Sequence, residues 1–323
     1  MTKQLTALLL LLCALPLRAQ AEGWTTIENG RLWTDDRGQT VQAHAPGFLQ
    51  WNGRWYMIGE DRSHPWTPDV NLYSSTDLQQ WRFEGKIIEN SVTTPTLGTS
   101  RFIERAKLFY NQQTRKFIVW CHWEGPGYRA SEAACFVSDS INGRYRLQWS
   151  GRPMGIKSRD CNIFTDDDGS AYFISTTSEN TNLGLFRLSD DYLRAETHTL
   201  LMPGMRREAP VIVRVDDIYY MLSSACTGWA PNQCMLSTSK SLHEGWTPLE
   251  KIGDSTAFRT QAAAIIKIEG TKQTTYLYIG DRWLAHDLAK TRTIIFPVYF
   301  ENGRCIFEYR KKFDINFQTG EIR

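Results

Sequence analysis

A strand motif that recurs five times is the feature of this sequence that most constrains its fold. Each copy is a turn followed by a short run of aromatic and β-branched residues, as in "DGSAYFISTT" and "TTYLYIGDRW". After each of the first four copies comes a second strand-like unit such as "NLYSSTDLQQW". The aromatic residues that mark the five copies are Tyr56, Phe117, Tyr172, Tyr220 and Tyr276.

The spacing of these copies predicts the architecture. Successive copies lie about fifty to sixty residues apart, and repeats of that length built from strands are typical of propeller blades. Helical periodicity is nearly absent. We therefore expect an all-β fold, a five-bladed β-propeller formed as one domain by residues 22–323. A large β-sandwich is the alternative.

The first 21 residues are typical of a cleaved signal peptide. Lys3 precedes the apolar run Leu8 to Leu17, and small residues at Ala19 and Ala21 follow it. The run is too short to span a bilayer as a stable helix. We expect cleavage after Ala21 and a secreted or periplasmic protein. A buried N-terminal helix and a lipid anchor at Cys13 are the alternatives.

Charge and composition exclude several classes of partner. The 323-residue chain has a formal net charge of +2, which falls to zero when Lys3 and Arg18 leave with the signal peptide. This balance gives no reason to expect binding to nucleic acid or an anionic membrane. We expect a monomer without membrane insertion.

The cysteines do not form a metal-binding pattern. There is no CxxC motif and no Cys/His cluster at ligand spacing, so we expect neither a metal nor a cofactor. Export permits disulfides, and Cys226 with Cys234 is a candidate local pair. The cysteines of the mature chain are Cys121, Cys135, Cys161, Cys226, Cys234 and Cys305.

A polar residue stands at the same place in every repeat, about eleven to fifteen residues before the aromatic marker. In a propeller, this place is the start of the innermost strand, so the five side chains would surround one mouth of the central channel. Each of the five residues is polar and precedes a mostly apolar run. A purely structural role would call for apolar or turn residues at these positions. These ring positions are His44, Glu104, Asp160, Glu208 and Gln261.

Carboxylates that converge in a concave site point to acid and base chemistry on a neutral polar substrate. Glycoside hydrolysis needs two such groups, one of which must stay protonated to donate to the leaving oxygen. Groups that face one another across a funnel leave room for a water molecule, which favours inversion. A third carboxylate nearby raises the pKa of the acid by like-charge repulsion.

Other residues are candidates for binding the substrate. Trp229 lies in the Gly/Pro-rich stretch "CTGWAPN" and could stack on a sugar ring, and Trp123 and Trp283 are similar but weaker candidates. Acidic residues that close second strands could bind hydroxyl groups or support arginines, and Arg159 could reach the funnel. These acidic candidates are Glu60, Asp61 and Asp281.

The sequence resembles glycoside hydrolase family 43, and within it the exo-β-1,3-galactanase branch, over nearly the whole mature chain. The stretches that carry the resemblance are "VQAHAPGFLQWNGRWYMIGED", "YSSTDLQQW", "FIERAKLFYN", "SRDCNIFTDDDG", "LSDDYL", "REAP", "CTGWAPN" and "GDRW". The resemblance implies a five-bladed propeller that cleaves with inversion and needs no cofactor in the chemical step.

The resemblance also assigns roles. It implies that Glu208 in "REAP" is the general acid and that Asp160 in "SRD" adjusts its pKa. The usual base of the family, an aspartate at the start of blade one, is absent from "QAHAPG", as it is in the galactanase branch. Glu104 and Gln261 are then expected to hold or activate the water, although a neutral amide has almost no basicity. His44 would line the pocket for the terminal sugar.

Two departures from the branch affect the expected substrate. Ala106 stands in "ERAK" where proline is usual, and "TQAAAII" lacks the Ser-Thr-Tyr that commonly follows the glutamine. The expected function is an inverting exo-glycosidase that releases galactose from β-1,3-galactan. The alternatives are an α-L-arabinofuranosidase, a β-D-galactofuranosidase and a sugar-binding propeller without catalysis.

Overall fold

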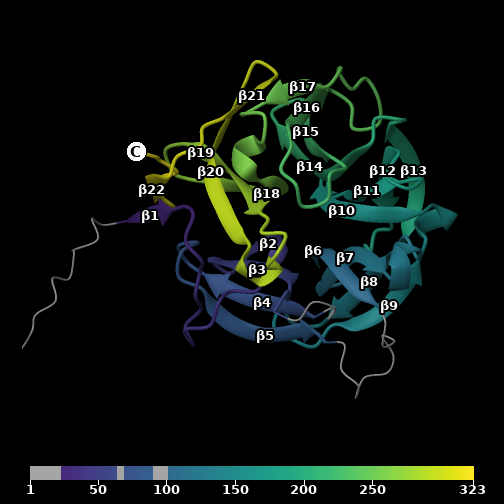
Figure 1. Ribbon diagram of the computed structural model, residues 1–323, viewed down its shortest axis with the longest axis horizontal. Coiled ribbons are helices and arrows are strands. Elements are labelled where there is room, and N and C mark those ends of the chain that lie inside the picture. The colour runs from purple at the N-terminus through teal and green to yellow at the C-terminus, as the bar shows by residue number, and fades with distance from the viewer. Residues whose placement is uncertain (1–22, 64–68, 90–100) are drawn as a thin grey trace, which may run out of the picture.

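The structure is a computed structural model that describes residues 23–63, 69–89 and 101–323. Five four-stranded sheets surround a central axis, with the innermost strands closest to it (Figure 1). The prediction of an all-β, five-bladed propeller is confirmed. The signal peptide predicted at residues 1–21 and the lipid-anchor alternative at Cys13 lie outside the described residues.

Within each blade the strands follow one another in chain order and pair antiparallel with their neighbours. Blade 1 consists of β2 (His44–Trp51), β3 (Arg54–Glu60), β4 (Val70–Ser75) and β5 (Arg82–Ile88). Blade 2 consists of β6 (Phe102–Asn111), β7 (Lys116–Glu124), β8 (Glu132–Ser138) and β9 (Arg146–Gly151). Blade 3 consists of β10 (Ser158–Thr165), β11 (Ala171–Thr177), β12 (Asn182–Leu188) and β13 (Ala195–Met202). Blade 4 consists of β14 (Arg207–Val215), β15 (Ile218–Ala225), β16 (Cys234–Ser239) and β17 (Glu250–Ile252). Blade 5 consists of β18 (Gln261–Glu269), β19 (Thr274–Arg282), β20 (Arg292–Glu301) and β21 (Arg304–Phe307).

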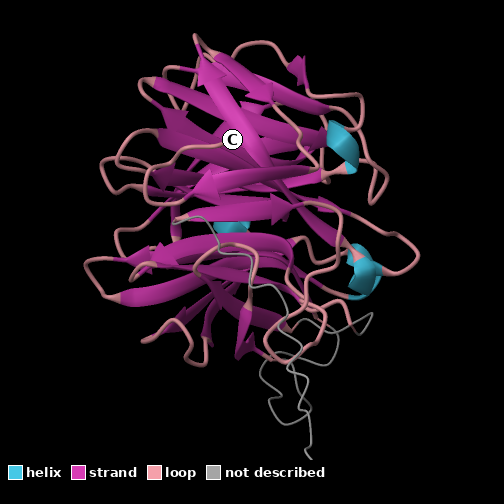
Figure 2. Cartoon of the chain, turned by 90° about the vertical axis from the view of Figure 1, so that its left-hand side faces the viewer, coloured by secondary structure: helices cyan, strands magenta, loops and turns pink. Residues whose placement is uncertain are grey.

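Helices in the described part of the chain are short 3-10 turns in the connections (Figure 2). None of them is long and apolar enough to cross a membrane. Their bounds are η2 (Pro126–Tyr128), η3 (Pro153–Gly155), η4 (Ala257–Arg259) and η5 (Leu288–Lys290).

The core is divided among the seams between blades, because both faces of each sheet are covered by a neighbour. Strand β7 shows how the sequence achieves this. Phe117 and Val119 point into the cluster shared with blade 1, whereas Ile118 and Trp120 point into the cluster shared with blade 3. Alternate strand residues face opposite sides of a sheet. A strand that is apolar at every position is therefore buried on both faces.

The ring closes where the two ends of the chain meet. Strand β1 (Trp24–Glu28) pairs with β22 (Lys312–Asn316) in a separate two-stranded sheet beside the seam between blades 5 and 1. Asn29 then joins this sheet to blade 5, since its amide donates to the carbonyl of Ile295 at 2.6 Å and its side-chain oxygen accepts from the same residue's N–H at 2.8 Å.

A buried lysine connects the inner strands at the axis. The ammonium group of Lys107 on β6 donates to the carbonyl oxygens of Ala45 at 2.8 Å, Pro46 at 2.7 Å and Ala263 at 3.2 Å. Burial, and next the charge of Arg105, lower the pKa of Lys107 to about 7. One side chain of blade 2 thus binds blades 1 and 5 across the channel.

Replacing this lysine by methionine should destabilise the ring. Lys107→Met leaves three buried carbonyls without their donor, and we expect the free energy of unfolding to fall by about 3 kcal/mol. Denaturant titration measures the change. The control is Lys116→Met, which removes an exposed lysine paired with Asp139 and should cost less than about 1 kcal/mol. Equal effects of the two variants would contradict the bridging role of Lys107.

Candidate active site

Four of the five predicted ring residues surround one cavity of about 370 Å³ at the axis. They stand at or near the starts of β6, β10, β14 and β18, which meet around the centre of the molecule (Figure 1). The cavity is lined by Ala45, Glu60, Arg62, Glu104, Arg105, His122, Tyr128, Arg159, Asp160, Asn180, Glu208, Cys226, Gly228, Trp229, Gln261 and Trp283.

Irregular pairing accompanies the ring positions. The antiparallel register shifts directly after Glu104 in β6 and after Glu208 in β14. The next residues, Arg105 and Ala209, have φ angles of 52° and 50°, which is the left-handed region that side chains rarely adopt. Such bulges redirect a side chain next to an active site. They account for carboxylates that face the cavity from strands whose later residues are apolar.

Glu208 has the properties of a general acid. Burial first, and then the negative charge of Asp160, raise the pKa of Glu208 to about 8, against the opposing charge of Arg105. The Glu208 carboxyl also accepts a 2.9 Å hydrogen bond from the Gln261 amide. Glu208 is therefore protonated at neutral pH and open to the cavity.

Gln261 is held in one orientation. The indole N–H of Trp283 donates to its side-chain oxygen at 2.9 Å, and the guanidinium of Arg105 lies 3.5 Å from the same atom. Its amide nitrogen donates to Glu208 and, at 3.1 Å, to the hydroxyl of Ser224. Because an indole N–H can only donate, the amide oxygen must face Trp283. The amide nitrogen must then face the acid.

Glu104 has the opposite protonation tendency from Glu208. Its carboxylate lies 3.0 Å from a guanidinium nitrogen of Arg62 and 3.1 Å from Nδ1 of His122, and it accepts the hydroxyl of Tyr128. Burial alone would raise the pKa of Glu104, but the contacts with His122 and Arg62 hold it below its usual range. Two of the glutamates that line the cavity thus differ in protonation, since Glu104 is ionised and Glu208 is protonated.

Glu60 lines the cavity but its oxygens are engaged by the protein. One accepts from Nε of Arg62 at 2.6 Å and the other from the backbone N–H of Arg105 at 2.7 Å. Of the two roles considered for Glu60, this geometry favours support of an arginine.

Arg159 and Trp229 line the cavity at its rim. Arg159 donates to the carbonyl of Tyr128 at 2.9 Å and pairs with Glu179 at 2.6 Å. Trp229 is 46% exposed, which leaves ring surface available to a sugar. Their roles in substrate binding stay predictions.

Four predicted site residues do not line the cavity. Asp61 accepts the backbone N–H of Ser63 at 2.9 Å. Trp123 packs in the core against Phe136, because strand alternation turns the preceding His122 rather than Trp123 toward the site. His44 is buried, with its ring centre 6.2 Å from that of Trp283, and burial lowers its pKa to about 3. Asp281 is buried and accepts the backbone N–H of Ala45 at 3.0 Å.

The candidate disulfide is also absent. Cys226 and Cys234 are both free thiols. Cys234 points into the core between blades 4 and 5, whereas Cys226 lines the cavity and donates to the carbonyl of Arg206 at 3.3 Å.

Sequence reasoning missed several lining residues that contribute polar groups, Arg105 among them. His122 pairs with Glu104 in the register of β6 and β7, so cross-strand pairing could have indicated it. Arg62 lies two residues beyond the end of β3. Tyr128 and Asn180 lie in connections and carried no such signal. Among the described residues, no group of three or more His, Cys, Asp or Glu side chains is arranged to hold a metal ion.

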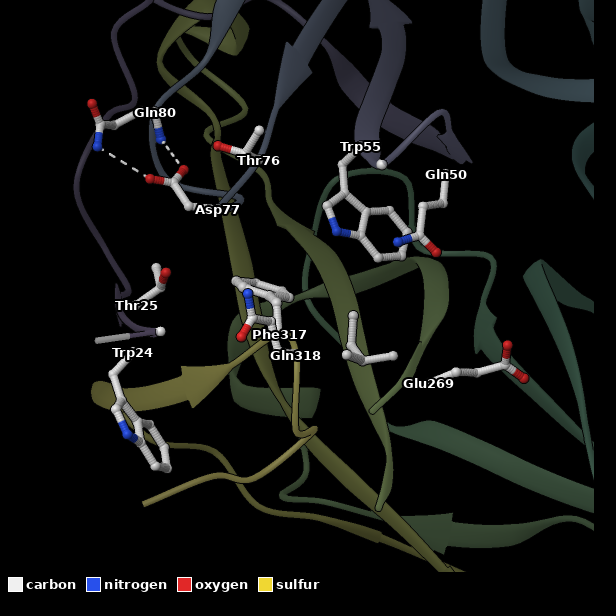
Figure 3. A pocket seen from close by; sticks show the side chains of 13 residues that line it. Trp24, Thr25, Gln50, Trp55, Thr76, Asp77, Gln80, Glu269, Phe317 and Gln318 are labelled. Atoms are coloured by element: carbon white, nitrogen blue, oxygen red, sulfur yellow. Dashed lines mark hydrogen bonds between the residues drawn. The ribbon is translucent and has the colours of Figure 1, made fainter. Parts of the chain in front are cut away.

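A larger cavity, of about 630 Å³, lies at the other ends of the inner strands between blades 5 and 1 (Figure 3). It contains none of the ring residues. Of its two tryptophans, Trp55 is 6% exposed and Trp24 is covered by the guanidinium of Arg323 at 4.2 Å from the ring centre. Asp77 there binds Gln80 of its own turn. This cavity lacks facing acid and base groups and is not the candidate active site.

Comparison with known proteins gives a consistent result. The profile of glycosyl hydrolases family 43 matches residues 44–293. Among curated proteins none matches the chain. A solved exo-β-1,3-galactanase from Clostridium thermocellum is similar at 35% identity and a TM-score of 0.88, covering 92% of this chain and 68% of that one.

Two further solved structures are similar. A family 43 β-1,3-galactosidase shows 33% identity and a TM-score of 0.85 over 90% of this chain, which spans only 63% of that protein. An exo-β-1,3-galactanase from Phanerochaete chrysosporium, solved with β-1,3-galactotriose, shows 30% identity and a TM-score of 0.86 over 92% of this chain and 70% of that one. With its propeller fold and its paired carboxyl groups, this chain belongs to glycosyl hydrolases family 43 and is a glycoside hydrolase.

Proposed function

We propose that this glycosidase is an inverting exo-enzyme that releases galactose from β-1,3-galactan, with Glu208 as general acid. The observation that carries the proposal is that Glu104, Asp160, Glu208 and Gln261 converge on one cavity. Burial and the charge of Asp160 raise the pKa of Glu208 there to about 8. The β-1,3-galactanases and galactosidase at 30–35% identity support the choice of sugar.

In this mechanism the carboxyl proton of Glu208 passes to the glycosidic oxygen as the bond to the anomeric carbon breaks. A water molecule attacks that carbon from the opposite side of the ring, which inverts its configuration, and the proton that the water loses passes to the ionised carboxylate of Glu104. Asp160 keeps Glu208 protonated before the transfer by like-charge repulsion.

Glu104 and Gln261 are the residues we propose to hold the water and the sugar hydroxyls. Glu104 is ionised and can accept hydrogen bonds from either. Gln261 acts by positioning, since its amide donates to the acid and its oxygen is engaged by Trp283. Trp229 would support the sugar beyond the bond that is cleaved.

The sequence of residues 1–21 supports a further part of the proposal, namely export by a cleaved signal peptide to a secreted or periplasmic location. The enzyme would act there as a monomer on a soluble or exposed polysaccharide.

One NMR experiment should test both the substrate and the stereochemistry. Release of galactose tests the sugar, and the anomer that appears first tests inversion. We expect proton NMR of the mature protein with β-1,3-galactotriose to show galactose appearing first as the α-anomer, because a single displacement inverts the β-linkage. A β-anomer would contradict inversion. Release from arabinofuranosyl or galactofuranosyl substrates, but not from galactotriose, would replace the proposed sugar.

Removing the acid should abolish turnover without unfolding the protein. Glu208→Gln keeps the shape but cannot donate a proton, and general acids contribute roughly 10²- to 10⁴-fold in rate. The pKa of Glu208 is higher in the folded protein than in the unfolded chain. At pH values above the unfolded pKa, the Glu208 carboxyl group therefore lowers the free energy of unfolding. The unfolding midpoint of the variant at neutral pH should therefore equal or exceed that of the wild type.

Glu269→Gln, in the cavity at the other ends of the strands, is the control. Near-normal turnover by Glu208→Gln would refute the assignment.

The pH profile should depend on Asp160. In the wild type, kcat/KM should fall as pH rises through about 8, where Glu208 loses its proton. Asp160→Asn removes a negative charge that raises this pKa, so the alkaline limb should move to lower pH. An unchanged limb in the variant would mean that another group controls the alkaline loss.

A further inference from the structure

A buried histidine stands between two carboxylates on the wall of the cavity. Nε2 of His122 lies 3.1 Å from Oε2 of Glu124, and Nδ1 lies 3.1 Å from Oε2 of Glu104. The second contact is an ion pair rather than a well-aligned hydrogen bond. The side chains of His122 and Glu124 are 1% and 0% exposed, so solvent does not screen this chain of charges.

Glu124 also fixes the loop that follows it. Its Oε1 accepts the backbone N–H groups of Gly125 at 2.9 Å and Ala130 at 2.7 Å, and that of Ser131 at 3.3 Å. The loop 125–131 carries Tyr128, whose hydroxyl donates to Glu104. Glu124 does not line the cavity itself. It contacts Glu104 indirectly, through the imidazole of His122 and through the loop that carries Tyr128.

We propose that Glu124 is a positioning residue that holds His122 as an imidazolium and thereby keeps Glu104 ionised and oriented at the cavity wall. The same carboxylate closes the loop that brings Tyr128 to Glu104. The effect on catalysis rests on the proposed role of Glu104, whereas the protonation of His122 does not.

The surroundings of His122 support this state. Burial alone would lower the pKa of His122, but the contacts with Glu104 and Glu124 raise it to about 9. Two buried carboxylates on opposite sides of one imidazole would repel one another, and a positive charge on the ring between them removes that cost. The titratable or charged groups that face the imidazole are Glu104, Glu124, Asp160 and Tyr128.

The first test needs no substrate. Nitrogen NMR of histidine rings in the wild type should show both nitrogens of His122 protonated at about pH 7.5, where an ordinary histidine is neutral. Glu124→Gln keeps an oxygen for the loop N–H groups but removes the charge, so His122 should be neutral at the same pH. A neutral His122 in the wild type, or an imidazolium in the variant, would overturn the proposal.

The second test separates positioning from loss of structure. Without the imidazolium charge, Glu104 gains a proton more easily, so Glu124→Gln should lose about tenfold in kcat/KM near pH 5 and little near neutral pH. A uniform loss at all pH values would indicate a structural role and overturn the positioning.

The matched control is Glu132→Gln. Glu132 begins β8 and pairs with Arg101 at 3.1 Å, so this change removes a carboxylate near the same loop without a contact to His122. It should leave both the titration of His122 and the pH profile unchanged. If the wild type releases no galactose while the NMR results hold, the proposed function fails and the assignment of His122 stands.

Discussion

The guanidinium of Arg105 is the group on which the site depends. It is 3% exposed and reaches from blade 2 to the carbonyl of Ala262 in blade 5 at 2.6 Å, and its charge lies 3.7 Å from Asp160 in blade 3. The backbone N–H of Arg105 is bound by Glu60 of blade 1 at 2.7 Å. Burial opposes the charge of Arg105, but the nearby carboxylates of Asp160, Asp281 and Glu60, from blades 3, 5 and 1, outweigh it and raise the pKa of the guanidinium. One buried cation placed among them lets the blades meet and limits how far the pKa of Glu208 can rise.

The same cavity gives two glutamates different protonation states because their surroundings differ. Glu104 faces His122 and Arg62, and their charges outweigh the effect of burial. Glu208 faces Asp160 and the neutral amide of Gln261, so burial and repulsion prevail. Pairs of groups whose pKa values are driven apart are the usual sign of divided acid and base roles. The difference does not depend on the identity of the sugar.

The strand repeat was sufficient to predict the five blades and the polar ring, because each apolar run must lie between two sheets. It placed Glu104, Asp160, Glu208 and Gln261 at the cavity. It failed for Trp123, where aromatic character suggested a sugar platform and strand parity put the ring in the core. His44 begins the inner strand of its blade as predicted, yet it is buried and does not line the cavity. Which side chain of a crowded wall reaches the surface depends on packing across blades, and one blade's sequence does not contain that information.

The pairing of β1 with β22 has a consequence for how the molecule forms. A hydrogen bond between Thr26 and Asp314 in this sheet joins residues 288 positions apart. Contacts at such separation form late, since the cost of closing the loop precedes any gain from the contact. As the ribosome delivers the chain from its amino end, the first four blades can stack while the seam beside blade 1 is still exposed. The apolar residues of that seam are covered only after nearly the whole chain has been made. The nascent protein is therefore most prone to aggregate in the interval before the ring closes.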